Sequence, residues 1–197
     1  MKMFNPSAED KGGNFELTPQ GAHKARCCRV IEIGEQHSDL YGTQDKVVIV
    51  FSLPDVLMDF GGDKKQKMIS NPFGIKISNN KKSTMRQYVN ALNPHAENLG
   101  EFLDRTCQVS VSHFTKNEVT RDRLDSVAPL IEGVPVGELD TEPFWFQWNN
   151  PDPSVWQMIP AFTQDMIKRA VNYPGSPVQQ MVDSLGENGD SGENMPF

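Results

Sequence analysis

The chain has 197 residues, a formal net charge of −7 and 37% hydrophobic residues, which suits one folded domain with appendages. It contains no run of about eighteen apolar residues, which excludes a membrane-spanning helix, and residues 1–10 lack the apolar core of a signal peptide, so we expect a soluble, cytoplasmic protein with no membrane partner. The three cysteines form no C-x-x-C pair, which predicts buried free thiols rather than a disulfide or a zinc site.

The charge is distributed unevenly along the chain. Residues 1–123 carry 17 Lys and Arg against 15 Asp and Glu, whereas residues 124–197 carry 2 against 11. A mildly basic body followed by an acidic tail is typical of nucleic-acid-binding proteins, but an ordinary solvated tail has the same composition. Charge alone leaves both interpretations open.

In chain order, the first predicted elements are two strands of a long β-hairpin. Apolar and polar residues alternate over Ala22–Ile33 and over Lys46–Leu53, the period of two of half-buried strands. The polar connection between them, Gly34–Asp45, is too long for a tight turn and is expected to form a mobile finger with Tyr41 near its tip. A third alternating run, Met68–Ser78, predicts a third strand that follows a cluster of lysines.

Two helices and two more strands are predicted next. A helix begins at Ser83 or Thr84 and ends before Pro94, and a shorter one covers Asn98–Asp104. The strands are Cys107–Ser112 and Val119–Val127. Three strands, a helical connection and two strands is the order of an OB-fold, a five-stranded Greek-key barrel whose face and loops bind oligonucleotides. An unrelated α+β sandwich has the same order, so the residues leave both folds open within a mainly β class.

The C-terminal third has a different composition. All three tryptophans lie within residues 145–156, and none of the residues from Glu142 to Asp152 is basic. A phosphate backbone would be repelled there, so we expect this segment to pack on the barrel rather than to stack on bases. A short amphipathic helix is predicted over Pro160–Ala170. The predicted organisation is an N-terminal arm (1–20), an OB-fold DNA-binding domain (21–130), a Trp-rich strap with the amphipathic helix (131–177) and a disordered acidic tail (178–197).

The last residues of the chain are Met-Pro-Phe behind an acidic stretch. This end resembles the C-terminal tip of bacterial single-stranded DNA-binding proteins, which is acidic and ends Asp-Ile-Pro-Phe. The resemblance implies that the tip recruits replication or recombination proteins, because a terminal aromatic ring can fill a pocket while carboxylates meet basic residues around it. The residues expected to bind such partners are Asp190, Glu193, Met195, Pro196 and Phe197.

The body carries a second resemblance, in two stretches. Ala25–Gly34 reads Ala-Arg-Cys-Cys-Arg-Val-Ile-Glu-Ile-Gly, and Lys46–Pro54 is a strand ending Leu-Pro. Both are similar to a family of bacteriophage and prophage single-stranded DNA-binding proteins with an OB-fold, which typically reads Ala-x-Cys-x-x-(Val/Ile)-Ile-Asp-x-Gly before such a strand. That family continues with a Ser-x-x-Arg helix and a Val-x-x-x-Pro ending, which Ser83 with Arg86 and Val127 with Pro129 match loosely. Glu32 replaces the usual Asp, and the Trp-rich strap has no counterpart that we can map.

The two resemblances together imply sequence-independent single-stranded DNA binding during phage DNA replication or recombination in the bacterial host cytoplasm. The candidate DNA-binding residues are basic and aromatic. Phe114 is the strongest stacking candidate because it belongs to the polar-facing set of its strand, whereas Phe73 fits the core equally well and a lone lysine is usually solvated surface. The candidates are Lys24, Arg26, Lys76, Arg121 and Arg123 on the barrel face, Lys64, Lys65, Lys67 and Lys116 at loop ends, and Tyr41, Phe73 and Phe114 as stacking platforms.

No catalytic arrangement competes with DNA binding. The four histidines lack metal-ligand spacing and there is no phosphate-binding loop, so we predict no enzyme activity, no metal and no cofactor. The alternative function is a protein-interaction adaptor of a replication machine with weak or no DNA binding. The sequence leaves open whether the protein forms a homo-oligomer.

Overall fold

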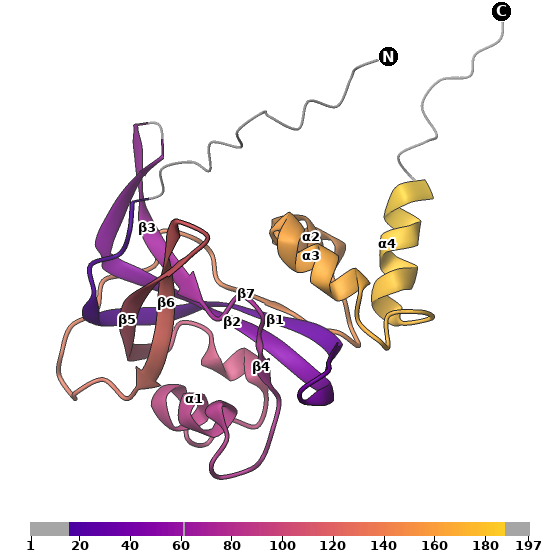
Figure 1. Ribbon diagram of the computed structural model, residues 1–197, viewed down its shortest axis with the longest axis horizontal. Coiled ribbons are helices and arrows are strands. Elements are labelled where there is room, and N and C mark those ends of the chain that lie inside the picture. Colours follow the sequence, from indigo (N-terminus) through magenta and orange to yellow (C-terminus); the bar gives the residue numbers. More distant parts are fainter. Residues whose placement is uncertain (1–15, 61, 188–197) are drawn as a thin grey trace, which may run out of the picture.

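The protein is mainly β, a curled antiparallel sheet in the shape of a half-barrel (Figure 1). A computed structural model describes residues 16–60 and 62–187. Five strands follow one another in the order β3 (Asp63–Ser70), β2 (Gly42–Phe60), β1 (Gly21–Ser38), β5 (Thr106–Lys116) and β6 (Val119–Ala128). Two short strands are added at the sides, β4 (Ile75–Lys76) next to β2 and β7 (Phe144–Phe146) next to β1. No helix in the described ranges is both long enough and apolar enough to cross a lipid bilayer.

The long hairpin forms from β1 (Gly21–Ser38) and β2 (Gly42–Phe60). The predicted loop over Gly34–Asp45 is wrong, because pairing continues to Ser38↔Gly42 and the turn is residues 39–41. These residues form a two-stranded ribbon without a continuous apolar face, so they lack the alternation that marks a half-buried strand. Tyr41 lies in the turn and is 73% exposed.

The predicted third strand is also wrong, because it is two strands. β3 (Asp63–Ser70) and β4 (Ile75–Lys76) are separated by a turn in which Gly74 has φ of +68°. Side chains rarely adopt this φ, and an added Cβ would lie only 3.0 Å from the Val47 carbonyl oxygen, so a larger residue would be strained here. Consequently the lysines predicted at the strand end, Lys64, Lys65 and Lys67, lie within β3.

One face of the curled sheet and the helical connection enclose the first hydrophobic cluster. Helix α1 (Thr84–Leu92) begins where the sequence predicts, with the Arg86 amide donating to the Ser83 hydroxyl at 3.1 Å. The second predicted helix is one turn of 3-10 helix, η1 (Leu99–Phe102), before β5 (Thr106–Lys116) and β6 (Val119–Ala128). Buried side chains of this first cluster include Phe51, Tyr88, Phe102 and Val109. The three cysteines are buried and free, as predicted, and burial raises the pKa of Cys28 to about 11 and that of Cys107 to about 12.

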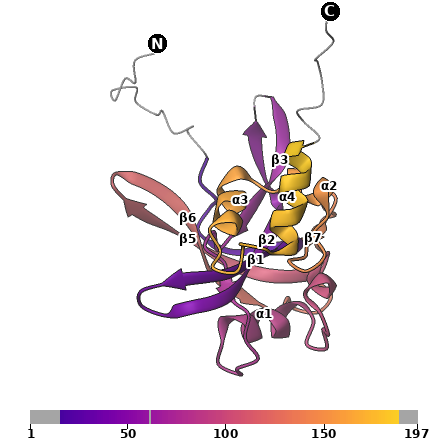
Figure 2. The same ribbon diagram turned by 90° about the vertical axis from the view of Figure 1, so that its right-hand side faces the viewer.

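The C-terminal segment covers the outer face of β1 and β2 (Figure 2). It contains β7 (Phe144–Phe146), which pairs parallel to β1, and then α2 (Pro153–Met158), α3 (Ala161–Lys168) and α4 (Pro177–Glu187). The second hydrophobic cluster forms here around Trp148, Trp156 and Ile167. Because α4 occupies 177–187, the disorder predicted from residue 178 is wrong for these residues. The expected partner-binding residues Asp190, Glu193, Met195, Pro196 and Phe197 lie outside the described ranges.

Glu32 fastens the Trp-rich segment to β1. Its carboxylate accepts a hydrogen bond from the Trp145 indole at 2.9 Å and another from the Trp148 amide at 2.8 Å. Both donors come from a segment more than a hundred residues away in sequence. This glutamate therefore positions β7 beside β1.

Side chains bridge the two edge strands of the half-barrel, β3 and β6. The Asp122 carboxylate on β6 accepts from the Thr18 amide and hydroxyl at 3.0 and 2.8 Å, and it pairs with Lys67 on β3 at 2.9 Å. The His113 ring contacts the Thr18 carbonyl oxygen at 2.7 Å, and Thr18 is fully buried. Thr18 is therefore bonded to both β5 and β6 and lies beside the ion pair that joins β3 to β6. We call these four residues the Asp122 cluster.

We predict that Asp122→Asn lowers the free energy of unfolding at pH 7 by about 1.5–3 kcal/mol, the usual value of hydrogen bonds to a charged group. Burial alone would raise the pKa of Asp122, but hydrogen bonds from Lys67 and Thr18 outweigh it and hold that pKa below its ordinary value. The carboxylate therefore stabilises the fold above the pKa of an unfolded Asp, and this contribution is lost as the pH falls through the lower folded pKa.

Urea unfolding at pH 7 and at pH 3 checks this prediction. The difference between the wild type and Asp122→Asn should be largest at pH 7 and shrink on acidification. Asp39→Asn is the matched control, because the Asp39 side chain is fully exposed in the hairpin turn. Equal stability of Asp122→Asn and Asp39→Asn at pH 7 would contradict the proposed role of the cluster.

Candidate nucleic-acid interface

The β5–β6 hairpin places an aromatic ring and three cations on one face. Cross-strand pairs are Ser112↔Arg123, Phe114↔Arg121 and Lys116↔Val119. Directly opposite residues of an antiparallel pair share a face, as do residues two apart along a strand. We call this set the β5–β6 strip: Phe114, Lys116, Val119, Arg121 and Arg123.

The strip is accessible to a ligand. Phe114 is 38% exposed and Val119 is 50% exposed. Within the described part of the chain, Lys116 and Arg121 have no carboxylate partner, while Arg123 pairs with Asp125 at 2.6 Å. The strip therefore offers an exposed ring with an arginine directly across from it and a free lysine beside it.

The sequence produces this face through strand alternation. On β5 the residues Cys107, Val109 and Val111 point into the first cluster, so alternate residues point outward. Beyond Val111 the hairpin extends past the core as a projecting ribbon (Figure 2). Its turn has positive φ at Asn117 and Glu118, 49° and 63°, as two-residue hairpin turns of this kind require. Phe114 is therefore held on an outward face by backbone geometry.

Two predicted DNA-binding cations, Lys24 and Arg26, are already engaged within the protein. Lys24 pairs with Asp55 at 2.8 Å and donates to the Pro135 carbonyl oxygen at 3.0 Å. Arg26 donates to the Gly137 carbonyl oxygen at 2.8 Å and pairs with Asp104 at 3.0 Å.

The bonds to carbonyl oxygens hold residues 135–140 over the outer face of the sheet. These residues are one part of the predicted Trp-rich strap, and from here on we call them alone the strap. Gln66 on β3 adds two more hydrogen bonds, both at 2.7 Å. Its side-chain amide donates to the Glu138 carbonyl oxygen, and its backbone amide donates to the Asp140 carboxylate. The two basic side chains therefore lie under the strap, where they bind its carbonyl oxygens and the carboxylates of Asp55 and Asp104.

The other candidate residues lie away from the strip. Lys67 belongs to the Asp122 cluster, Lys64 and Lys65 are exposed on β3, and Lys76 is exposed on β4. Phe73 is 64% exposed and meets the Phe162 ring edge-on, with 6.1 Å between centroids. Of the twelve candidates, the structure therefore brings four together on one surface, namely Phe114, Lys116, Arg121 and Arg123.

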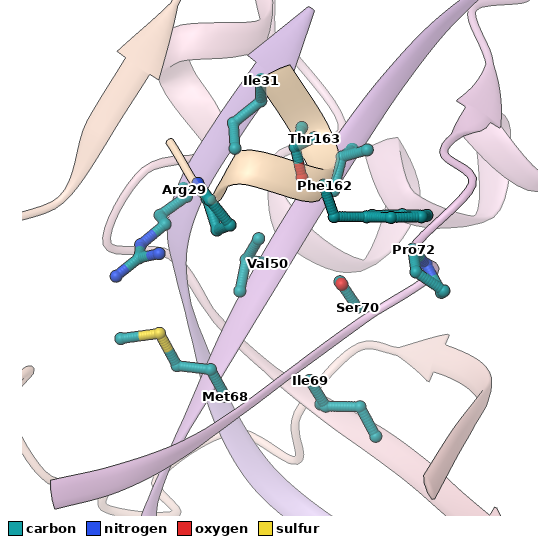
Figure 3. A pocket seen from close by; sticks show the side chains of 11 residues that line it. Arg29, Ile31, Val50, Met68, Ile69, Ser70, Pro72, Phe162 and Thr163 are labelled. Carbon is teal, nitrogen blue, oxygen red and sulfur yellow. The ribbon is translucent and has the colours of Figure 1, made fainter. Parts of the chain in front are cut away.

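The sequence reasoning missed a second surface, a groove between the outer face of β2 and β3 and helix α3 (Figure 3). Arg29 lies at one side of it, with its guanidinium 5.3 Å from the centroid of the Phe144 ring. The signal that could have found it is a basic residue in the middle of a buried strand, since a charge there needs a partner or a function.

No model of a known protein family matches the chain, and no curated protein matches it. Within residues 16–60 and 62–187, no group of three or more His, Cys, Asp and Glu side chains is placed to hold a metal ion.

We predict that Arg26→Ala and Arg121→Ala differ in their effect on folding. Arg26 makes several bonds with the strap and is 15% exposed, so its loss should lower the free energy of unfolding by about 1–3 kcal/mol. Arg121 has no ion pair or side-chain hydrogen bond with any described residue, so its variant should stay within about 0.5 kcal/mol of the wild type. Urea denaturation measures both, and equal destabilisation by the two variants would contradict this assignment.

Proposed function

We propose that the protein binds single-stranded DNA without sequence preference. The observation that carries the proposal is the β5–β6 strip, where Phe114 lies directly opposite Arg121 with Lys116 alongside. Unpaired bases stack on aromatic rings, and cations contact the phosphates between them. Stacking accepts every base, because each has a flat π face, so the strip suits binding that does not depend on sequence.

The topology supports the same proposal. The strand order β3-β2-β1-β5-β6, with α1 inserted before β5, agrees with a five-stranded OB-fold. In that fold the hairpin between the last two strands is one of the loops that contact oligonucleotides, and here it is the hairpin that carries the strip. We therefore propose an OB-fold protein of phage replication or recombination, acting in the bacterial cytoplasm, whose acidic tail recruits partner proteins.

One observation favours the alternative of a protein-interaction adaptor. Lys24, Arg26 and Lys67 form ion pairs within the chain, which leaves fewer free cations for phosphates. An adaptor would bind DNA negligibly at physiological salt. Binding to the phosphate backbone, in contrast, falls steeply as salt rises, because counterions are released.

We predict that a fluorescently labelled oligo-dT binds the protein at low salt, and that duplex DNA of equal length binds more weakly. Phe114→Ala should weaken single-strand binding about 5- to 150-fold, the range expected for loss of one stacked base. Arg121→Ala should reduce the slope of log affinity against log salt by about 0.7, the value for one phosphate contact on a single strand. Anisotropy titrations at several salt concentrations measure both effects.

Lys82→Ala is the matched control for the removal of one cation, because Lys82 is exposed beside α1 and outside the strip. Its affinity for oligo-dT should equal that of the wild type. Absence of binding at low salt would favour the adaptor, and equal losses from Lys82→Ala and Arg121→Ala would mean that binding reflects general charge rather than the strip.

A further inference from the structure

The groove beside α3 has a defined floor and defined walls (Figure 3). Its volume is about 190 Å³. In the sheet, Arg29 pairs in register with Val50, and Val50 pairs with Ser70, so these three side chains form one row across β1, β2 and β3. Met68 continues the floor, and Phe162 of α3 forms the opposite wall.

Among the described residues, this row lies between two covered parts of the outer sheet face. On one side, the strap lies over Arg26 and Gln66. On the other side, Ile31 and Val48 are buried in the second cluster together with Met166 and Ile167 of α3. The groove therefore lies in the gap between the part of the sheet face under the strap and the part under α3.

Arg29 supplies a positive charge in this gap. It is half-buried, its guanidinium lies over the Phe144 ring, and no carboxylate of the described residues lies within ion-pair distance of it. A partly desolvated cation without a counter-ion is costly, and an external anion would compensate it. Arginine also offers the planar donor geometry that suits phosphate.

An aromatic surface lies on the other side of the same gap. Phe162 is 49% exposed although it lines the groove, and the more exposed Phe73 meets it edge-on. Figure 3 shows the Phe162 ring and Arg29 on opposite sides of Val50. A ligand that matches this arrangement carries a flat ring and an anionic group a short distance apart.

We infer that this groove is a second single-stranded DNA subsite, which takes one unpaired nucleotide with its base against Phe162 and a neighbouring phosphate at Arg29. The inference rests on the proposed function and extends it, because α3 thereby becomes part of the DNA-binding surface. Duplex DNA cannot bind in this way, because its bases are stacked inside the double helix and cannot enter the groove between the sheet and α3.

The test uses Phe162→Ala and Arg29→Gln in anisotropy titrations with a short and a long oligo-dT. Phe162→Ala should weaken binding of the long oligonucleotide about 5- to 150-fold, the range for loss of one stacked base. Arg29→Gln should weaken it too and should reduce the slope of log affinity against log salt by about 0.7, the value for one phosphate contact. Each variant should change binding of an oligonucleotide short enough to cover the strip alone by less than twofold. Val171→Ala, an exposed apolar residue outside the groove lining, and Lys168→Ala, a cation on α3 that lies over Trp156, are the matched controls. Both controls should bind like the wild type.

Photocrosslinking with an oligo-dT that contains 5-bromodeoxyuridine gives a second readout on the unmodified protein. Crosslinks to the peptides that contain Met68 or Phe162 support the groove. Crosslinks at Phe114 with none in the groove, and with full affinity in both groove variants, would overturn the inference while leaving the proposed function intact. Absence of any DNA binding would instead overturn both.

A peptide also could supply a flat ring and an anionic group close together. A synthetic peptide of residues 188–197, which ends in a phenylalanine carboxylate, tests this ligand as a competitor of the oligonucleotide. If the peptide binds the wild type but not Arg29→Gln, and the groove variants keep full affinity for the long oligonucleotide, the groove is a peptide site and the nucleotide inference is wrong.

Discussion

The architecture depends on how β1 divides its hydrogen bonds between neighbouring strands. A strand has only two edges, and on one of them β5 pairs as far as Arg26↔Thr106, while β7 pairs from Arg29 onward. The change of partner from β5 to β7 coincides with the register shift between Cys27 and Arg29. At this point the Cys27 amide donates to the Arg105 carbonyl oxygen, and the Asp104 amide donates to the Cys27 carbonyl oxygen. One strand therefore contributes Val30 to the first hydrophobic cluster and Ile31 to the second.

Local patterns in the sequence predict much of this fold. The alternation over Ala22–Ile33 and the Ser83 cap mark elements whose causes lie within a few residues. The ribbon at 34–45 escapes prediction because it lacks a continuous apolar face. Helix α4 has a helical pattern in its sequence, because Val178, Met181, Val182 and Leu185 recur at helical spacing. The proline and glycine residues on either side of it are typical of a linker, and the disorder predicted there rests on them.

In the candidate site too, features set by neighbouring residues could be predicted, and features set by distant residues could not. Alternation predicts that Phe114 points outward, and the structure places it on an outward face. Which cations are free cannot be predicted locally, because Lys24 and Arg26 are engaged by carbonyl oxygens about 110 residues later in the chain. Arg29 escapes notice because the register shift beside it changes which residues of β1 share a face.

The shared strand β1 also limits how this chain can be divided. A half-barrel shortened after β6 would leave the edge of β1 unpaired at residues 29–31 and would expose Ile31, Ile33 and Val48 to water. An unpaired strand edge next to an apolar patch favours self-association. The barrel strands therefore do not form a separable module, and any gain or loss of the C-terminal segment by recombination would have to be accompanied by replacement of the outward-facing residues of β1 and β2.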